Sequence, residues 1–303
     1  MGTLFVGNNY VLGMDIGGSH VTAGLVDLDN KRIFPDSLRR VNLDSQGSTE
    51  EILNVWRGIV ESCYTDYKDM PKHIGLAMPG PCDYEQGICY IEGLSKYSNL
   101  YGLNVCQGLA RALKIPEENI RMTNDAACFL QGELDMGVGR KYQNPIGITL
   151  GTGCGTAKIR HGIGVDGALW QHPFKGGIVE DFISTKWFNQ RYAELTGQEI
   201  HGVKELTEKN NSELLVKSVF EEFAFNLAEF IHFFVSKENP DAIILGGNML
   251  KAQHIFLPKV QMELTKTGIM EPIHLSNLGE SAAILGAASA YVKKKMYLKS
   301  KIA

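Results

Sequence analysis

The hydrophobic pattern predicts strands and helices that alternate along most of the chain. Apolar runs on both sides of Gly17 and Gly18 indicate an antiparallel hairpin within residues 10–29, because glycine favours the tight turn that reverses a strand. Short apolar runs predict further strands within residues 31–34, 73–78, 119–125, 145–160, 241–248 and 273–275. Apolar residues at helical spacing predict helices within residues 48–67, 103–114, 126–134, 179–195, 212–236 and 281–298. Such an alternation is typical of an α/β protein.

The first hairpin has a counterpart later in the chain. Residues 145–160 align with the first hairpin without gaps, so that Gly17 matches Gly151 and Thr22 matches Thr156. A unit of strand, glycine turn and strand that occurs twice suggests two similarly built halves facing one another across a cleft, each offering its turn to one ligand. With 303 residues, the chain is long enough for two domains.

The residues of the first hairpin indicate a phosphate and metal site. Gly17 and Gly18 have no Cβ, so that backbone N–H groups at the turn can approach an anion closely. Asp15, on the strand just before the turn, can hold a divalent cation against the same anion, directly or through water. A tight hairpin without a ligand is the alternative interpretation.

Three further boundaries between predicted elements carry candidate chemistry. Asn124 and Asp125 stand between a strand and a helix, where one of them is expected to cap the helix and the other to accept a proton as a general base. The sequence Pro79-Gly80-Pro81 ends another strand, either as a simple terminator or as a ligand loop. Gly246 and Gly247 permit close approach of a flat or phosphorylated ligand, although a turn that starts a helix is an alternative.

Composition excludes several classes of protein. A formal net charge of −4 and a pI near 6.1 argue against a nucleic-acid-binding surface. The chain has no apolar run of transmembrane length, and its first ten residues do not resemble a signal peptide, so that we expect a cytoplasmic protein without a membrane partner. The six cysteines form no C-x-x-C pair and are expected to be small buried apolar groups.

The ordered set of these motifs, over nearly the whole chain, resembles the ROK family of sugar kinases in the hexokinase and actin superfamily. The motifs are Asp15-Ile-Gly-Gly, the Pro79-Gly80-Pro81 turn, Asn99-Leu100, Asn124-Asp125-Ala126, the Leu150–Gly155 loop and Leu245-Gly-Gly. The resemblance implies two RNase H-like (actin-like ATPase) α/β domains around a central cleft. The expected smaller domain comprises residues 1–122 with the C-terminal helix 281–303, and the larger domain comprises residues 123–280.

The resemblance also implies a role for each site residue. Asp125 becomes the catalytic base, and Asp15 serves Mg²⁺. The residues expected to bind the sugar are Gly80, Asn99, Asn124, His172 and Glu180. The residues expected to bind ATP, besides Asp15, are Gly17, Gly18, Thr22, Gly151, Thr152, Gly153, Gly246 and Gly247.

Two departures from the family pattern lie at the expected sugar site. The family's E-x-G-H segment is Leu169-Trp170-Gln171-His172 here, so that an apolar residue replaces a glutamate expected to bond sugar hydroxyls. The zinc-binding cysteine cluster that follows in the family is absent, and we therefore expect no zinc site. Without zinc, His172 also loses the ion that normally positions it. These changes affect substrate identity more than reaction type.

The sequence thus predicts an ATP-dependent kinase that phosphorylates glucose or a related hexose or N-acetylhexosamine, expected at C6. One alternative is a catalytically silent sugar-binding or nucleotide-binding protein, against which Asp125 argues. The other is a sugar-sensing transcriptional regulator, for which we expect no DNA-binding domain because the first hairpin begins at Tyr10. The resemblance further suggests a homodimer.

Overall fold

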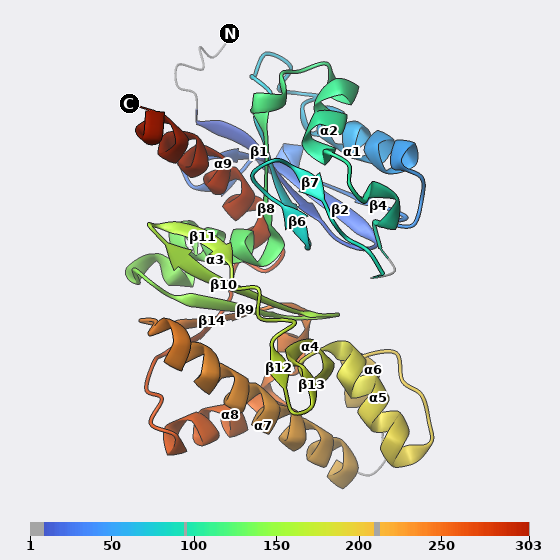
Figure 1. Cartoon of the computed structure of the whole chain (residues 1–303), viewed down its shortest axis with the longest axis vertical. Coiled ribbons are helices and arrows are strands. Elements are labelled where there is room, and N and C mark those ends of the chain that lie inside the picture. Colours follow the sequence, from blue (N-terminus) through green and yellow to red (C-terminus); the bar gives the residue numbers. More distant parts are fainter. Residues whose placement is uncertain (1–8, 94–95, 209–212, 303) are drawn as a thin grey trace. The chain divides into compact units, whose positions relative to one another are not determined.

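The computed structural model describes residues 9–93, 96–208 and 213–302 (Figure 1). Contacts within the chain group it into two units, which are described in turn. The first comprises residues 1–137, 163–165 and 280–303, and the second comprises residues 138–162 and 166–279. Residues 123–137 are grouped with the first unit, because the helix that they contain packs against the C-terminal helix. The domain boundary expected at residue 122 stays a prediction.

The first unit contains a mixed sheet with the strand order β3-β2-β1-β5-β8, in which β4 also pairs with β2. The strands are β1 (Tyr10–Ile16), β2 (His20–Asp27), β3 (Arg32–Ile33), β4 (Arg39–Asn42), β5 (Ile74–Met78) and β8 (Ile120–Asn124). Strands β1 and β2 are antiparallel, which confirms the first predicted hairpin, whereas β1, β5 and β8 run parallel. The carboxyl ends of these three parallel strands therefore meet at one edge of the sheet, where α/β proteins commonly bind ligands.

Four α-helices belong to the described part of this unit: α1 (Thr49–Cys63), α2 (Val105–Leu113), α3 (Asp125–Met136) and α9 (Ser281–Ile302). Helix α1 begins with a capping box, in which the Ser48 side chain accepts from the Glu51 backbone N–H and the Glu51 side chain accepts from Ser48. Its buried face carries Trp56, which is fully buried in the core of this unit. Between β5 and α2, the chain forms the small hairpin β6 (Cys82–Asp83) and β7 (Ile88–Cys89).

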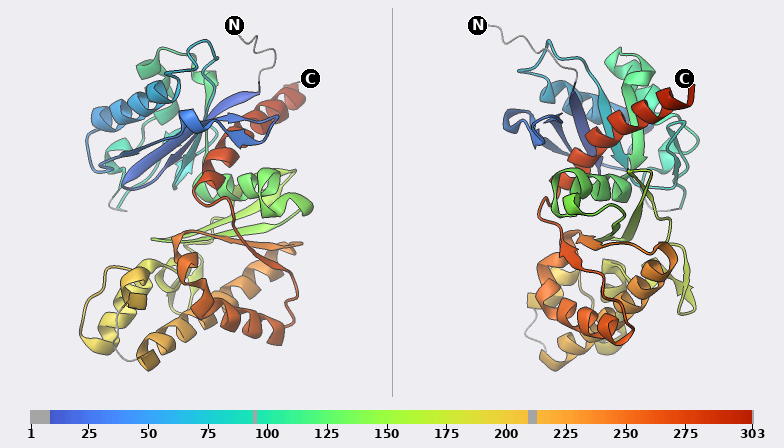
Figure 2. Two further views of the ribbon diagram at one scale, coloured as in Figure 1. Left: turned by 180° about the vertical axis from the view of Figure 1, so that it is seen from behind. Right: turned by 90° about the vertical axis from the view of Figure 1, so that its left-hand side faces the viewer.

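Helix α9 lies beside α3 in both views of Figure 2, and glycines make this close approach possible. A Cβ added to Gly286 would lie 1.7 Å from the backbone oxygen of Cys128 on α3. A Cβ added to Gly13 on β1 would lie 2.0 Å from the backbone oxygen of Ile284 on α9. The small residues of α9 thus let its backbone contact both the helix and the sheet.

The second mixed sheet has the strand order β11-β10-β9-β14-β15, and its strands β10, β9, β14 and β15 belong to the second unit. The strands are β9 (Ile146–Leu150), β10 (Cys154–Arg160), β11 (Ile163–Asp166), β14 (Ile243–Gly246) and β15 (Ile273–Leu275). Strands β9 and β10 form the second predicted hairpin, and β9, β14 and β15 are parallel. A separate small hairpin consists of β12 (Pro173–Phe174) and β13 (Gly177–Ile178). Each unit therefore pairs an antiparallel glycine hairpin with parallel strands, and the predicted α/β class with two similarly built halves is confirmed.

Helices of the described second unit are α4 (Val179–Phe182), α5 (Thr185–Thr196), α6 (Val203–Glu208), α7 (Glu213–Glu238) and α8 (Gln253–Lys266). The prediction of one continuous helix over residues 179–195 was wrong. The helix is interrupted at Ile183 and Ser184, because the Ser184 side chain accepts a hydrogen bond from the backbone N–H of Trp187 and caps a new helix. Helix α7 is the predicted long core helix, with Phe223, Phe230 and other apolar residues fully buried.

Short 3₁₀ helices complete the described structure: Pro35–Ser37, Ser98–Leu100, Glu117–Asn119, Val138–Lys141 and Asn248–Ala252. Five of the six cysteines are buried as predicted, and Cys82 is half-buried. Among the helices of the described ranges, none combines the length and the hydropathy that a membrane span requires.

Candidate active site

The first glycine turn joins the carboxyl end of β1 to the start of β2. The backbone N–H of Gly17 donates to the backbone oxygen of His20 at 3.0 Å, which closes the turn. A Cβ on Gly17 would lie 3.0 Å from the same oxygen, so that the turn favours glycine there. Gly18 is exposed at this turn.

Asp15 lies on β1 next to this turn, among other carboxylates. Burial, and after it the negative charges of Asp125 and Glu280, raise its pKa to about 7, although the positive charge of Arg40 opposes them. A carboxylate held among like charges gains from a bound cation. Mg²⁺ commonly uses one or two protein carboxylates together with water and phosphate oxygens, so that Asp15 fits such an ion. Among the described residues, no three His, Cys, Asp or Glu side chains gather to form an all-protein metal cage.

Thr22 is paired with Asp15 across the hairpin. Its side chain is buried, and its hydroxyl oxygen has no hydrogen-bond partner among the described residues. The equivalent Thr156 of the second hairpin has such a partner, because its hydroxyl oxygen accepts from the backbone N–H of Leu169 at 3.1 Å. The Thr22 hydroxyl oxygen is buried, and Thr22 remains a predicted nucleotide-binding residue.

Asn124 and Asp125 stand where β8 ends and α3 begins. The Asn124 side-chain oxygen accepts from the backbone N–H of Ala127 at 3.0 Å, so that Asn124 is the residue that caps the helix. Its side-chain nitrogen donates to Oδ1 of Asp125 at 3.1 Å. The same Oδ1 accepts from the backbone N–H of Ala126 at 2.8 Å. These two donors hold one oxygen of the Asp125 carboxylate in place.

The surroundings of Asp125 favour its neutral form, with one cation opposing. Burial is the largest effect and raises the pKa of Asp125. The hydrogen bond from Ala126 and the positive charge of Lys96 lower the same pKa. A carboxylate whose pKa is raised in this way is a better proton acceptor once it is ionised.

Gly80 and Asn124 both lie next to Tyr84, a residue that no sequence motif indicated. A Cβ on Gly80 would lie 2.7 Å from the hydroxyl oxygen of Tyr84, and the same hydroxyl accepts from the Asn124 side chain at 3.1 Å. Tyr84 lies between β6 and β7. The structure therefore brings Gly80, Asn124 and Asp125 together at the ends of β5 and β8, with Tyr84 as an unpredicted neighbour.

Asn99 is exposed and takes part in backbone contacts of the same unit. Its side-chain nitrogen donates to the backbone oxygens of Gln46 and Gly47, each at 3.0 Å. Its backbone oxygen accepts from the Thr49 hydroxyl at 2.7 Å. Asn99 therefore supports the loop that leads into α1, and its expected contact with a sugar stays a prediction.

The second glycine turn is held by the side chains of Glu180 and Thr185. The Glu180 carboxylate accepts from the backbone N–H of Cys154 at 3.0 Å. A Cβ on Gly153 would lie 2.2 Å from the same carboxylate oxygen. The backbone oxygen of Gly151 accepts from the backbone and hydroxyl of Thr185, at 2.9 and 2.8 Å. Glu180, expected on the sugar, thus supports the turn expected to hold phosphate, while Thr152 at the tip is exposed.

Gly247 lies against the strand that leads into this turn. Its φ of 94° is in the region that favours glycine, and a Cβ there would lie 2.2 Å from the backbone oxygen of Leu150. Gly246 is the last residue of β14, which pairs with β9. In the second unit, the fold therefore places Gly246 and Gly247 beside the strand that leads into the 151–153 turn, and their contact with a nucleotide stays a prediction.

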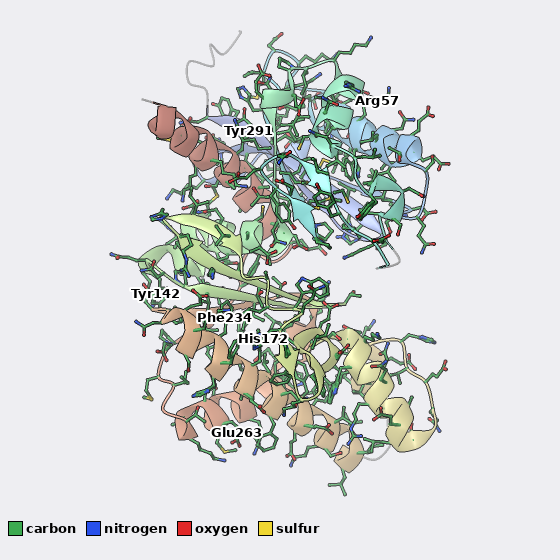
Figure 3. The ribbon with its side chains drawn as sticks, in the orientation of Figure 1. Arg57, Tyr142, His172, Phe234, Glu263 and Tyr291 are labelled. Atoms are coloured by element: carbon green, nitrogen blue, oxygen red, sulfur yellow. The ribbon has the colours of Figure 1, made fainter. Side chains whose placement is uncertain are left out.

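His172 lies on the loop before β12, against α7 (Figure 3). Its ring is stacked on the ring of Phe233, a residue that sequence reasoning did not single out. Leu169, which replaces the expected glutamate, is buried in the apolar core of the second unit. The substitution therefore places that side chain in the core.

The chain is similar to known proteins over most of its length. The chain matches the model of the ROK family over residues 11–294. It is 24% identical to a glucokinase of Thermotoga maritima, over 92% of this chain and 96% of that protein. It is 23% identical to an N-acetyl-D-glucosamine kinase of Haemophilus influenzae, over 93% of this chain and 99% of that protein.

A similar fold occurs in a ROK family glucokinase from Streptomyces griseus, whose crystal structure is a complex with glucose and AMPPNP. The TM-score is 0.73 at 20% identity, and the match covers 92% of this chain and 98% of that one. On the family match over most of its length, the chain belongs to the ROK family of sugar kinases, in the actin-like ATPase superfamily.

Proposed function

We propose that the protein transfers the γ-phosphoryl group of ATP to the C6 hydroxyl of glucose or of a related hexose or N-acetylhexosamine. The observation that carries this proposal is the Asp125 carboxylate, oriented by Asn124 and lying near Asp15 and the first glycine turn. This arrangement is what phosphoryl transfer to an alcohol needs, namely one base at the acceptor hydroxyl and a phosphate site beside it.

Asp125 would take the proton of the sugar hydroxyl as the new oxygen–phosphorus bond forms. The bond between the γ-phosphorus and the bridging oxygen of ATP breaks in the same step, and ADP leaves. Asn124 would keep the carboxylate in the orientation that accepts this proton, through its 3.1 Å hydrogen bond to Oδ1. Gly80, Asn99, His172 and Glu180 are proposed to bind the sugar.

The glycine turns are proposed to bind the nucleotide through their backbone N–H groups. Gly17, Gly18 and Thr22 would do so in the first unit. Gly151, Thr152 and Gly153 would do so in the second unit, where Gly246 and Gly247 would border the adenosine. Asp15 would hold Mg²⁺, directly or through water, and the ion would neutralise phosphate charge.

Two kinds of relative support a substrate with a glucose ring. The kinases that the chain resembles include a glucokinase and an N-acetyl-D-glucosamine kinase. Because Leu169 stands where the family has a glutamate, one contact to sugar hydroxyls is missing. A sugar with an acetamido group, or with altered stereochemistry at C2 or C3, is therefore included among the proposed substrates.

Sugar-dependent release of ADP tests this function. Purified protein with Mg²⁺ and ATP is assayed against glucose, mannose and the N-acetylhexosamines, and the position of the phosphate on the product is determined by NMR. We expect one sugar to be phosphorylated at C6. Tight sugar binding without ADP release for any of them would instead support a silent sensor. A homodimer is also proposed, and light scattering during size-exclusion chromatography measures it.

A further inference from the structure

Lys96 lies beside the first glycine turn, and its charge acts on the proposed base. It precedes the 3₁₀ helix Ser98–Leu100 and is half-buried. The Cδ atom of Lys96 lies 3.9 Å from the position that a Cβ on Gly18 would occupy. Its positive charge also acts on Asp125, whose pKa it lowers. The side chain thus contacts the turn expected to hold phosphate, and its charge reaches the carboxylate expected to take the proton.

Tyr97 fixes the backbone next to this lysine. Its ring is fully buried and lies 6.3 Å, between centroids, from the ring of Trp56. The Tyr97 hydroxyl donates to the backbone oxygen of Gly17, and its backbone N–H donates to the backbone oxygen of Ser45 at 2.7 Å. Tyr97 therefore ties the segment that carries Lys96 directly to the first glycine turn.

We propose that Lys96 is a further catalytic residue, whose ammonium group contacts the phosphoryl group while it passes from ATP to the sugar hydroxyl. The proposal rests on the function proposed above. During transfer, negative charge is spread over the oxygens of the moving phosphoryl group, and a fixed cation beside it lowers the barrier. The proton of the sugar hydroxyl goes to Asp125, so that Lys96 acts as a cation and not as a base.

The position of Lys96 suits this role better than a purely structural one. A lysine needed only to neutralise Asp125 would have no reason to lie along the phosphate turn. The Lys96 stem lies within van der Waals distance of the position that a Cβ on Gly18 would occupy. Lys96 and Asp125 therefore border the same place from two segments of the first unit.

Three variants test the proposal, once a substrate of the wild-type protein is known. Lys96→Met keeps the aliphatic stem and removes the charge, and Lys96→Arg keeps a charge. Lys68→Met, at an exposed lysine just after α1, is the matched control. We expect Lys96→Met to lower kcat by about 10²-fold or more with a small change in sugar KM. Lys96→Arg should keep part of the kcat that Lys96→Met loses, and Lys68→Met should have the kcat of the wild type.

Two further measurements separate catalysis from folding. Thermal unfolding should give similar melting temperatures for all variants. A fourth variant, Lys96→Ala, should regain part of its activity when methylammonium ions are added, because these ions replace the missing ammonium group. A Lys96→Met variant that keeps its kcat while the wild type is active would overturn the role of Lys96 and leave the kinase function intact. A wild-type protein without activity on any sugar would overturn both.

Discussion

The imidazole ring of His172 lies parallel to the phenyl ring of Phe233, with 4.2 Å between the centroids and 13° between the planes. Phe233 belongs to α7, and the Nζ atom of Lys237 lies 5.8 Å from the centroid of its ring. The cysteines that would bind zinc beside this histidine in the family are absent from the sequence. The stack on Phe233 packs the His172 ring against α7.

Replacing Phe233 should therefore weaken sugar binding. Phe233→Leu removes the stack, which contributes about 0.5–1.5 kcal/mol for an aromatic pair, so that sugar KM should rise roughly 2–10-fold with less effect on kcat. Phe225→Leu is the control, because Phe225 lies on the same helix and is 45% exposed. Steady-state kinetics measure the change. Equal KM values for both variants and the wild type would mean that the stack does not position His172 for the sugar.

Removing the proposed base should abolish most of the turnover. Asp125→Asn keeps the shape of the side chain but cannot accept the proton, so that kcat should fall by about 10²–10⁴-fold with a small change in sugar KM. Coupled ADP release measures this, and sugar binding by calorimetry checks that the variant is folded. Near-normal turnover would remove Asp125 from the base role.

Protonation of Asp15 should make the stability of the free protein depend on pH. Its pKa is about 7 in the folded state and 3.8 when unperturbed, so that the folded state keeps a proton that the unfolded chain loses. The free energy of unfolding should therefore fall as pH rises from about 4 to about 7, by at most about 1.4 kcal/mol per pH unit. Above the folded-state pKa, this contribution is fully lost.

Urea unfolding across this pH range, with a metal chelator and without nucleotide, measures the slope. Asp15→Asn stays neutral, and its stability should depend less on pH than that of the wild type. Asp69→Asn, at an exposed carboxylate, should keep the wild-type slope. If the curves of the wild type and Asp15→Asn run parallel, Asp15 does not titrate in this range.

Chelators should distinguish two metals. Treatment with a zinc-selective chelator should leave activity and melting temperature unchanged, because a family-type zinc site lacks its cysteine ligands. Excess EDTA should stop turnover by removing Mg²⁺, and added Mg²⁺ should restore it. A fall in activity or stability with the zinc chelator alone would reveal a further metal site.

The contact between α9 and α3 should tolerate no larger residue. In Gly286→Ala, the new Cβ would lie 1.7 Å from a backbone oxygen of α3, so that the variant should lose about 3 kcal/mol of stability or more. Gly58→Ala, on the exposed face of α1 where a Cβ meets no atom within 4 Å, should gain about 0.5–1 kcal/mol. Chemical unfolding measures both. Similar stabilities for the two variants would contradict the close helix packing.

The elements that the sequence predicted well depend on local interactions. Both glycine hairpins, the capping box at Ser48 and the boundary at Asn124 are confirmed, because turns and caps use hydrogen bonds between residues a few positions apart. The break at Ser184 was missed, since the apolar spacing continues across it while the serine side chain starts a new helix. Periodicity alone does not report such a break.

The sequence by itself determined the family, the paired glycine turns and the Asn124-Asp125 boundary, because each depends on short motifs of consecutive residues. Only the tertiary structure decided which distant side chains meet: Glu180 on the second turn, Phe233 on His172, and Lys96 beside Gly18. These partners are separated by long stretches of chain and belong to no motif. Their contacts arise from how helices and loops pack on each sheet, and the spacing of residues along the chain does not predict that packing.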